Sequence, residues 1–109
     1  MPQQVRTVPA SEVPEDAVLL DVREDDEWVA GHAEGAVHIP MGDVPARLAE
    51  VPEGDPLYVV CRSGGRSARV VAWLDRNGHD AVNVGGGMGE WEAAGRPMVS
   101  ETGRQPFVR

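Results

Sequence analysis

Residues 57–67 of this 109-residue chain read LYVVCRSGGRS, an apolar run that leads directly into a cysteine and a pair of glycines. The first four residues form a continuous apolar stretch, which is typical of a strand covered on both faces. After the glycines, small and apolar residues recur at the spacing of one helical face. They are Ser67, Val70, Val71 and Leu74. The stretch therefore predicts a strand, a short loop and a helix, which is the building unit of an α/β fold.

The rest of the chain continues this alternation without repeats or linkers. Further strands are expected at residues 5–8, 17–22, 36–39 and 81–84, and helices at 24–30, 43–51 and 90–94. The pattern predicts a three-layer α/β/α fold in which helices cover both faces of a five-stranded, mainly parallel sheet. The length suits one domain over residues 1–109, with a core at about 5–98. Residues 99–109 form a C-terminal extension, and the weak periodicity of 97–109 indicates an arm or loose tail.

Composition excludes several classes of protein. Hydrophobic residues make up 41% of the chain, enough for a packed core, and the single cysteine rules out an internal disulfide or a cysteine-based metal cage. No apolar run is long enough to span a membrane, and the first residues lack the plan of a signal peptide. We therefore expect a cytoplasmic protein. The use of arginine without any lysine suggests a bacterial source with a GC-rich genome.

The net charge of −8 is unevenly distributed. Residues 56–74 contain three arginines and no acid, whereas the other 90 residues contain eighteen acids and seven arginines, a net −11. An acidic chain of this kind lacks the basic face that nucleic acid requires. The only cysteine lies in the cationic segment, so a small anion is the expected ligand there.

The loop after the cysteine has the features that stabilise a thiolate. Cys61 follows a strand at the edge of the sheet where α/β proteins bind ligands. The next helix directs its N-terminal N–H groups toward the loop, and two glycines allow the backbone to form an anion-binding nest. Arg62 and Arg66 add positive charge. We expect a lowered pKa for the Cys61 thiol. The alternative, an inert cysteine at the end of a core strand, does not explain such a loop.

Four segments of the chain resemble the rhodanese sulfurtransferases. Residues 61–67 resemble the active-site loop of that family, and three other stretches match its remaining motifs in order and spacing. These stretches are 19–24 with Glu27-Trp28 and Gly31-His32, residues 35–40, and Gly86-Gly87 with Trp91, Gly95 and Pro97. The match covers about residues 5–98. One departure is Ala33-Glu34, where the family usually has isoleucine and proline.

The resemblance implies a thiosulfate sulfurtransferase that carries sulfur as a persulfide on Cys61, with no metal and no cofactor. The expected donor is a small anion such as thiosulfate, and the expected acceptor is cyanide, a thiol or a protein. Substrate binding is expected from the rest of the loop: Arg62, Ser63, Gly64, Gly65, Arg66 and Ser67. Arg66 either binds substrate or pairs with an acid and braces the loop. Asp21 and Arg23 end a neighbouring strand and are expected to support the loop through hydrogen bonds or an ion pair; the alternative is an ordinary ion pair at the end of a strand.

Two other functions fit parts of the pattern. Cysteine phosphatases and arsenate reductases of related fold use Cys-x5-Arg, whereas Arg66 follows Cys61 as Cys-x4-Arg, a smaller loop that suits a single sulfur atom better than phosphate. A binding or regulatory module could keep the fold without turnover. The three histidines are too scattered for a metal site. Residues 85–89, although glycine-rich, indicate a tight strand-to-helix turn.

Overall fold

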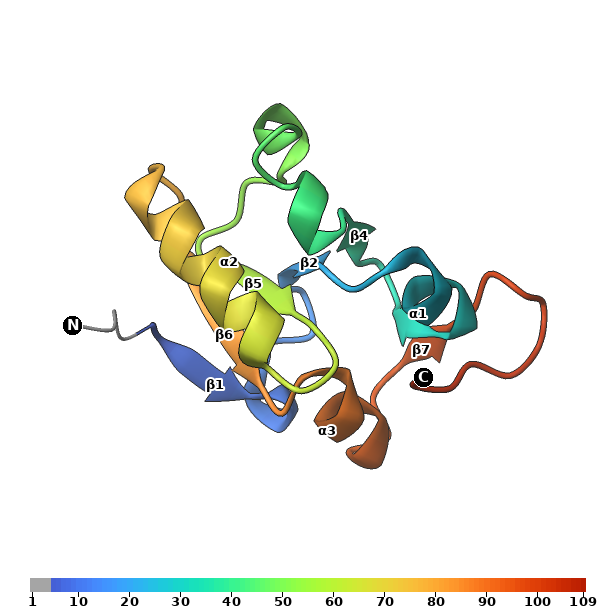
Figure 1. Cartoon of the computed structure of the whole chain (residues 1–109). Helices are drawn as coiled ribbons and strands as arrows, with labels where there is room; N and C mark the ends of the chain where they lie inside the picture. The colour runs from blue at the N-terminus through green and yellow to red at the C-terminus, as the bar shows by residue number, and fades with distance from the viewer. Residues whose placement is uncertain (1–4) are drawn as a thin grey trace.

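The computed structural model describes residues 5–109 and contains a central sheet of five parallel strands (Figure 1). The order across the sheet is β1-β6-β5-β2-β4. The strands are β1 (Thr7–Pro9), β2 (Val18–Asp21), β4 (Val37–His38), β5 (Leu57–Val60) and β6 (Ala81–Gly85). The expected five-stranded parallel sheet is confirmed. A small antiparallel pair, β3 (His32–Ala33) with β7 (Met98–Val99), lies outside it and was not predicted.

Helices connect the strands and cover the sheet. They are α1 (Asp25–Ala30), α2 (Gly65–Arg76) and α3 (Gly87–Ala93), with short 3-10 helices η1 (Ala10–Glu12), η2 (Met41–Asp43) and η3 (Leu48–Glu50). The four residues of α2 expected on its inner face are its buried residues. Within the described residues no helix is long and apolar enough to cross a bilayer.

The central strand β5 supplies side chains to two separate cores, one on each face of the sheet. Leu57 and Val59 pack with the buried face of α2, whereas Val60 packs with α3 and η1. This alternation follows from the two-residue period of a strand. The two cores give the predicted three layers. The end of β5 lies beside the N-termini of α2 and α3.

The prediction of a helix at residues 43–51 is wrong. The structure has η2 and η3 there instead. Pro52 disfavours helical geometry at the preceding residue, and Pro45 supplies no N–H, so too few residues remain for a stable α-helix.

The C-terminal segment is not a loose tail. Residues 98–99 form β7, and two later residues bind the end of α1. Glu101 donates its N–H to the Val29 carbonyl at 3.0 Å, and Phe107 donates to the Ala30 carbonyl at 3.1 Å. The segment therefore supplies donors for the last carbonyls of α1, which have no partners within their own helix.

Candidate active site

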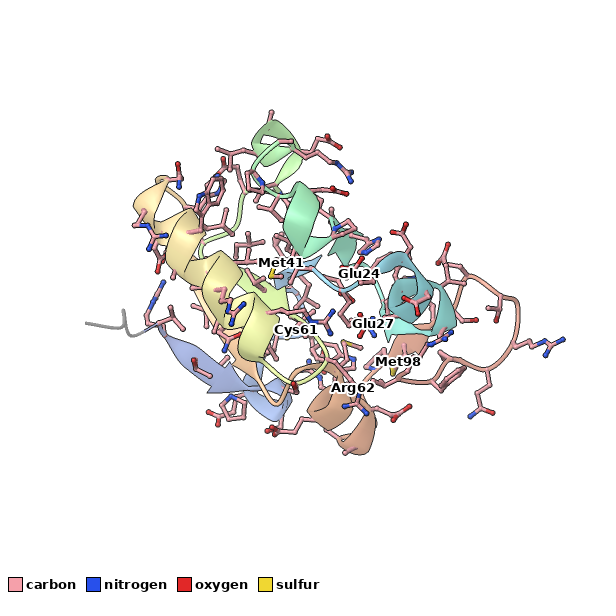
Figure 2. All side chains as sticks on the ribbon, viewed as in Figure 1. Glu24, Glu27, Met41, Cys61, Arg62 and Met98 are labelled. Carbon is pink, nitrogen blue, oxygen red and sulfur yellow. The ribbon has the colours of Figure 1, made fainter. Side chains whose placement is uncertain are left out.

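Cys61 lies immediately after β5, at the carboxyl edge of the sheet, and is 1% exposed (Figure 2). The loop that follows turns sharply at Gly64, whose φ of 110° is available to glycine but strained for other residues. Helix α2 starts at the next residue. The strand, the loop and the helix N-terminus thus surround one sulfur atom.

The Cys61 sulfur accepts hydrogen bonds from its own loop and from the first turn of α2. The N–H of Gly64 donates at 3.0 Å and the hydroxyl of Ser67 lies 3.3 Å away. Burial raises the pKa of the Cys61 thiol, but the Ser67 hydroxyl and the N–H groups of Ser67, Gly64 and Ser63 lower it by more, so the pKa lies below its ordinary value. The predicted lowering of this pKa therefore has a geometric basis.

The N-terminus of α3 fixes the loop from the other side. Met88 donates its N–H to the Cys61 carbonyl at 2.8 Å, and Gly89 donates to the Arg62 carbonyl at 3.0 Å. Gly87 makes this approach possible, because an added Cβ there would lie 2.4 Å from the Cys61 carbonyl oxygen. The glycines after β6 therefore form a strand-to-helix turn, as expected, and also dock onto the cysteine loop, which the sequence did not indicate.

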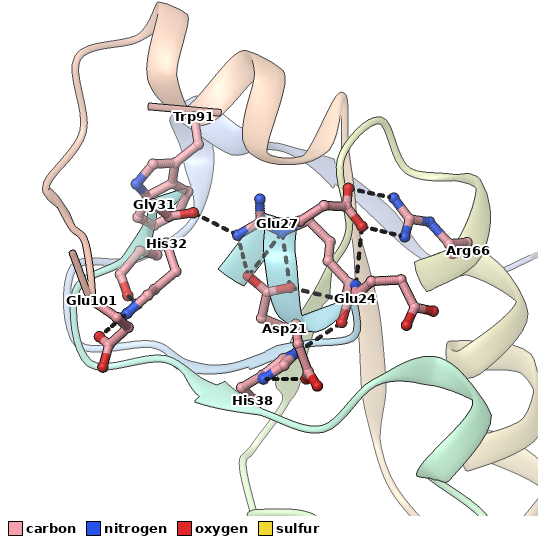
Figure 3. A network of polar contacts seen from close by, with 12 residues as sticks. Asp21, Glu24, Glu27, Gly31, His32, His38, Arg66, Trp91 and Glu101 are labelled. Carbon is pink, nitrogen blue, oxygen red and sulfur yellow. Dashed lines mark hydrogen bonds and ion pairs between the residues drawn. The ribbon is translucent and has the colours of Figure 1, made fainter. Parts of the chain in front are cut away.

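Arg66 is bound by an acid in this structure. Its guanidinium forms two hydrogen bonds with the Glu27 carboxylate, at 2.7 and 2.9 Å, joining α2 to α1 (Figure 3). The hydrogen bond from Arg66 lowers the pKa of Glu27. The same carboxylate also accepts the N–H of Glu24 at 3.0 Å in the capping box of α1. Of the two roles considered for Arg66, this geometry is that of the loop brace.

Asp21 and Arg23 form a fully buried ion pair at the end of β2. Arg23 donates to both carboxylate oxygens of Asp21, at 2.8 to 3.1 Å, and to the Gly31 carbonyl at 2.8 Å. Its Nη1 has no hydrogen-bond partner within residues 5–109. These contacts join the end of β2 to Gly31, the residue that follows α1.

The C-terminal segment approaches the same region. His32 lies 2.8 Å from the Glu101 carboxylate and stacks on Trp28 with ring centroids 3.4 Å apart. Arg62 points outward and donates to the backbone oxygen of Arg109 at 3.1 Å. Arg62 is thus placed beside the loop rather than against the Cys61 sulfur.

The sequence model of the rhodanese-like domain matches residues 10–94. The chain belongs to the rhodanese-like family. YtwF of Bacillus subtilis is 43% identical over 86 residues, covering 79% of this chain and 84% of that protein. The thiosulfate sulfurtransferase GlpE of Actinobacillus succinogenes is 34% identical over 94 residues, 85% of each chain. The crystal structure of a rhodanese-related protein from Thermoplasma volcanium superposes with a TM-score of 0.79 at 30% identity, covering 86% of this chain and 97% of that one.

Membership of the rhodanese-like family supports sulfurtransferase activity at the level of the family. In this rhodanese-like domain the Cys61 sulfur accepts hydrogen bonds from Gly64 and Ser67, whereas the Arg62 and Arg66 guanidiniums bind Arg109 and Glu27. Among residues 5–109 no group of three His, Cys, Asp or Glu is placed to bind a metal ion.

Two residues of the site were missed by sequence reasoning. Glu27, the partner of Arg66, belongs to a stretch that resembles a family motif, but it is one of four consecutive acids and the motif did not indicate which arginine it would bind. Asn83 accepts a hydrogen bond from the Ser67 hydroxyl at 2.6 Å. A signal for Asn83 was present, because it is a polar residue in the middle of an apolar strand.

Proposed function

We propose that this rhodanese-like domain transfers the outer sulfur of thiosulfate, or of a similar anionic donor, to a thiophilic acceptor through a persulfide on Cys61. The observation that carries the proposal is the set of donors around one cysteine sulfur: the N–H of Gly64 and the hydroxyl of Ser67. They favour the thiolate, which is the nucleophilic form of cysteine. The N–H groups of the loop, with the Arg62 charge beside them, would attract an anionic substrate to that thiolate.

In the first step the Cys61 thiolate attacks the outer sulfur of thiosulfate. A sulfur–sulfur bond forms to Cys61, the sulfur–sulfur bond of thiosulfate breaks, and its electron pair leaves with sulfite. The negative charge then lies on the terminal sulfur of the persulfide, where N–H groups of the loop and the N-terminus of α2 stabilise it.

In the second step a nucleophilic acceptor, cyanide or a thiol, attacks that terminal sulfur. The bond to Cys61 breaks and its electron pair returns to Cys61 as thiolate. Because Cys61 is the only cysteine of the chain, no second thiol of the chain can take the sulfur. The acceptor must therefore come from outside it.

The size and burial of the site favour sulfur over phosphate as the transferred group. Cys61 is 1% exposed, and the nearest donors lie 3.0 and 3.3 Å from its sulfur. Arg66, the arginine at Cys-x4-Arg, is occupied by Glu27. A single sulfur atom needs less room than a tetrahedral phosphate. It also does not need the arginine side chain that would surround a phosphate.

The direct test of turnover is thiosulfate:cyanide transfer, measured as thiocyanate. We expect activity in the wild type and none above background in Cys61→Ser. Arg62→Gln should raise the KM for thiosulfate, whereas Arg104→Gln, the same change of charge at an exposed residue of the C-terminal segment, should not. Activity in Cys61→Ser would overturn the proposal. A wild type that takes no sulfur would indicate the binding module, and hydrolysis of p-nitrophenyl phosphate would indicate the phosphatase.

A further inference from the structure

Asn83 is a buried amide directly behind the Cys61 loop. It lies on β6 between two buried valines and is 5% exposed. Its Nδ2 donates to the Gly64 carbonyl at 3.3 Å and to the Thr7 hydroxyl at 3.5 Å. Its Oδ1 accepts from the Ser67 hydroxyl at 2.6 Å. With oxygen acceptors at the nitrogen end and a hydroxyl at the oxygen end, the amide has one satisfactory orientation.

The Ser67 hydroxyl has one proton and two acceptors within reach. Its oxygen lies 2.6 Å from Asn83 Oδ1 and 3.3 Å from Cys61 Sγ. While Cys61 is a neutral thiol, the shorter contact takes the proton, and the thiol can donate its own proton to the Ser67 oxygen. A thiolate can only accept, and a hydrogen bond to a charged acceptor is about twice as strong as a neutral one. The charged sulfur therefore draws the hydroxyl proton away from the amide.

We propose that Asn83 is a positioning residue for the Ser67 hydroxyl. While Cys61 is neutral, the hydroxyl donates its hydrogen bond to the amide oxygen of Asn83. When the sulfur is charged, the hydroxyl donates to the sulfur instead. The inference rests on Cys61 being the reactive sulfur of the proposed function. In that cycle Sγ carries the charge twice, when the thiolate attacks the donor and when the acceptor removes the sulfur. In the persulfide the charge lies on the outer sulfur, and the hydroxyl returns to Asn83.

Asn83 and Ser67 then have opposite effects on the thiolate. Ser67 stabilises the charged sulfur, whereas Asn83, by accepting the same proton, stabilises the state with a neutral thiol. Such a balance has a chemical use, because the intrinsic nucleophilicity of a thiolate falls as its pKa falls. Asn83 would limit how far the pKa of Cys61 is lowered, so that the thiolate favoured by Gly64 and Ser67 remains a good nucleophile.

The charged groups around Cys61 belong to other residues and stay the same in each test variant. Arg66 interacts electrostatically with Cys61 from α2 and is paired with Glu27 of α1. Asp21 and Arg23 neutralise each other at the end of β2. A shift of the Cys61 alkylation profile on substitution of Asn83 or Ser67 therefore reports a change in hydrogen bonding to the sulfur.

The test is the pH dependence of alkylation by iodoacetamide, which reports on one site because Cys61 is the only cysteine. In Asn83→Val, a residue that suits a strand flanked by valines, we expect the profile to move to lower pH, with alkylation about three- to tenfold faster on its acidic limb. In Ser67→Ala we expect the opposite, about tenfold slower alkylation on that limb. In the double variant, Asn83→Val should add no change to that of Ser67→Ala.

The same measurements can overturn the inference. A profile of Asn83→Val that stays in place or moves to higher pH would do so, as would an equal shift in the Ser67→Ala background, which would mean that Asn83 acts through Gly64. If Asn83→Val does not fold, Asn83→Ala decides, because it removes the same acceptor without adding a charge and must also move the profile to lower pH. Alkylation needs no sulfur transfer, so a protein that alkylates as expected but takes no sulfur from thiosulfate contradicts only the proposed function.

Discussion

At the scale of the residue, the chemistry of Cys61 depends on a few hydrogen bonds that outweigh burial. Desolvation alone would raise the pKa of a thiol this deep inside the protein and leave less of it as thiolate. The Gly64 N–H and the Ser67 hydroxyl reverse that effect because the turn into α2 aims both at the sulfur. The ion pair between Arg66 and Glu27 joins α2, whose first turn carries Ser67, to α1.

The Arg66–Glu27 pair should make a pH-dependent contribution to stability. The pKa of Glu27 is lowered by Arg66 from an ordinary 4.5, so the stabilisation is present above that value and is lost as the pH falls through the lower pKa of the folded state. We expect Glu27→Gln to lower the free energy of unfolding by about 1 kcal/mol at pH 7, since Arg66 is partly solvated.

Urea denaturation at several pH values checks this. The difference in the free energy of unfolding between wild type and Glu27→Gln should disappear as the pH falls below 4.5. Glu50→Gln, which removes the more exposed pair with Arg47, serves as the control and should have a smaller effect at every pH. A gap that stays constant into acid would show that Glu27 stabilises by packing and not by charge.

The partners of the loop arginine illustrate what sequence can and cannot predict at this scale. The types of residue around Cys61 follow from the motif, because a nucleophilic sulfur needs donors and positive charge. The choice of Glu27 depends on how α1 and α2 meet, 39 residues apart in sequence. The four adjacent acids carry equal charge, and only the direction in which each side chain leaves α1 decides which of them reaches Arg66.

At the scale of the element, the loop is fixed by the N-termini of two helices. Helix α2 directs N–H groups at the sulfur, and α3 directs the N–H groups of Met88 and Gly89 at the carbonyls of Cys61 and Arg62. The periodicity of α2 was enough to predict its buried face. The docking of α3 was not predictable, because it depends on backbone contact at Gly87, which leaves no pattern of side chains.

Gly87→Ala should disrupt this docking. The new Cβ would lie 2.4 Å from the Cys61 carbonyl oxygen, at a φ of 55° that already disfavours alanine. We expect a loss of at least about 2 kcal/mol in the free energy of unfolding, with slower alkylation of Cys61.

Gly35→Ala is the matched control for Gly87→Ala. It has a similarly positive φ of 82° but nothing within 4 Å of the added Cβ, so only the backbone cost of about 1 kcal/mol applies. Equal losses in the two variants would contradict the docking role of Gly87.

At the scale of the whole molecule, the C-terminal segment returns across α1 and ends beside the cysteine loop. Its contacts with α1 are largely backbone hydrogen bonds, from Glu101 and Phe107 to the last carbonyls of the helix. Bonds of this kind have no characteristic residue pattern, which is why the segment looked like a loose tail in the sequence. The parallel sheet, by contrast, followed from continuous apolar strands.

Gly31→Ala should detach part of this segment and leave the sheet intact. An added Cβ would lie 2.5 Å from the Phe107 carbonyl oxygen, whereas the φ of 171° at Gly31 is open to alanine. Amide hydrogen exchange should be slow at Phe107 in the wild type and much faster in the variant, with β5 and β6 unchanged. Equal protection of Phe107 in both proteins would show that the segment is not bound to α1 in solution.

The central claim is that Cys61 accepts one sulfur atom, and intact-protein mass spectrometry tests it most directly. After incubation with thiosulfate, the wild type should gain the mass of one sulfur, lose it on addition of a thiol reductant, and show no gain in Cys61→Ser. A wild type whose mass does not change, or a gain that persists in Cys61→Ser, would contradict the account.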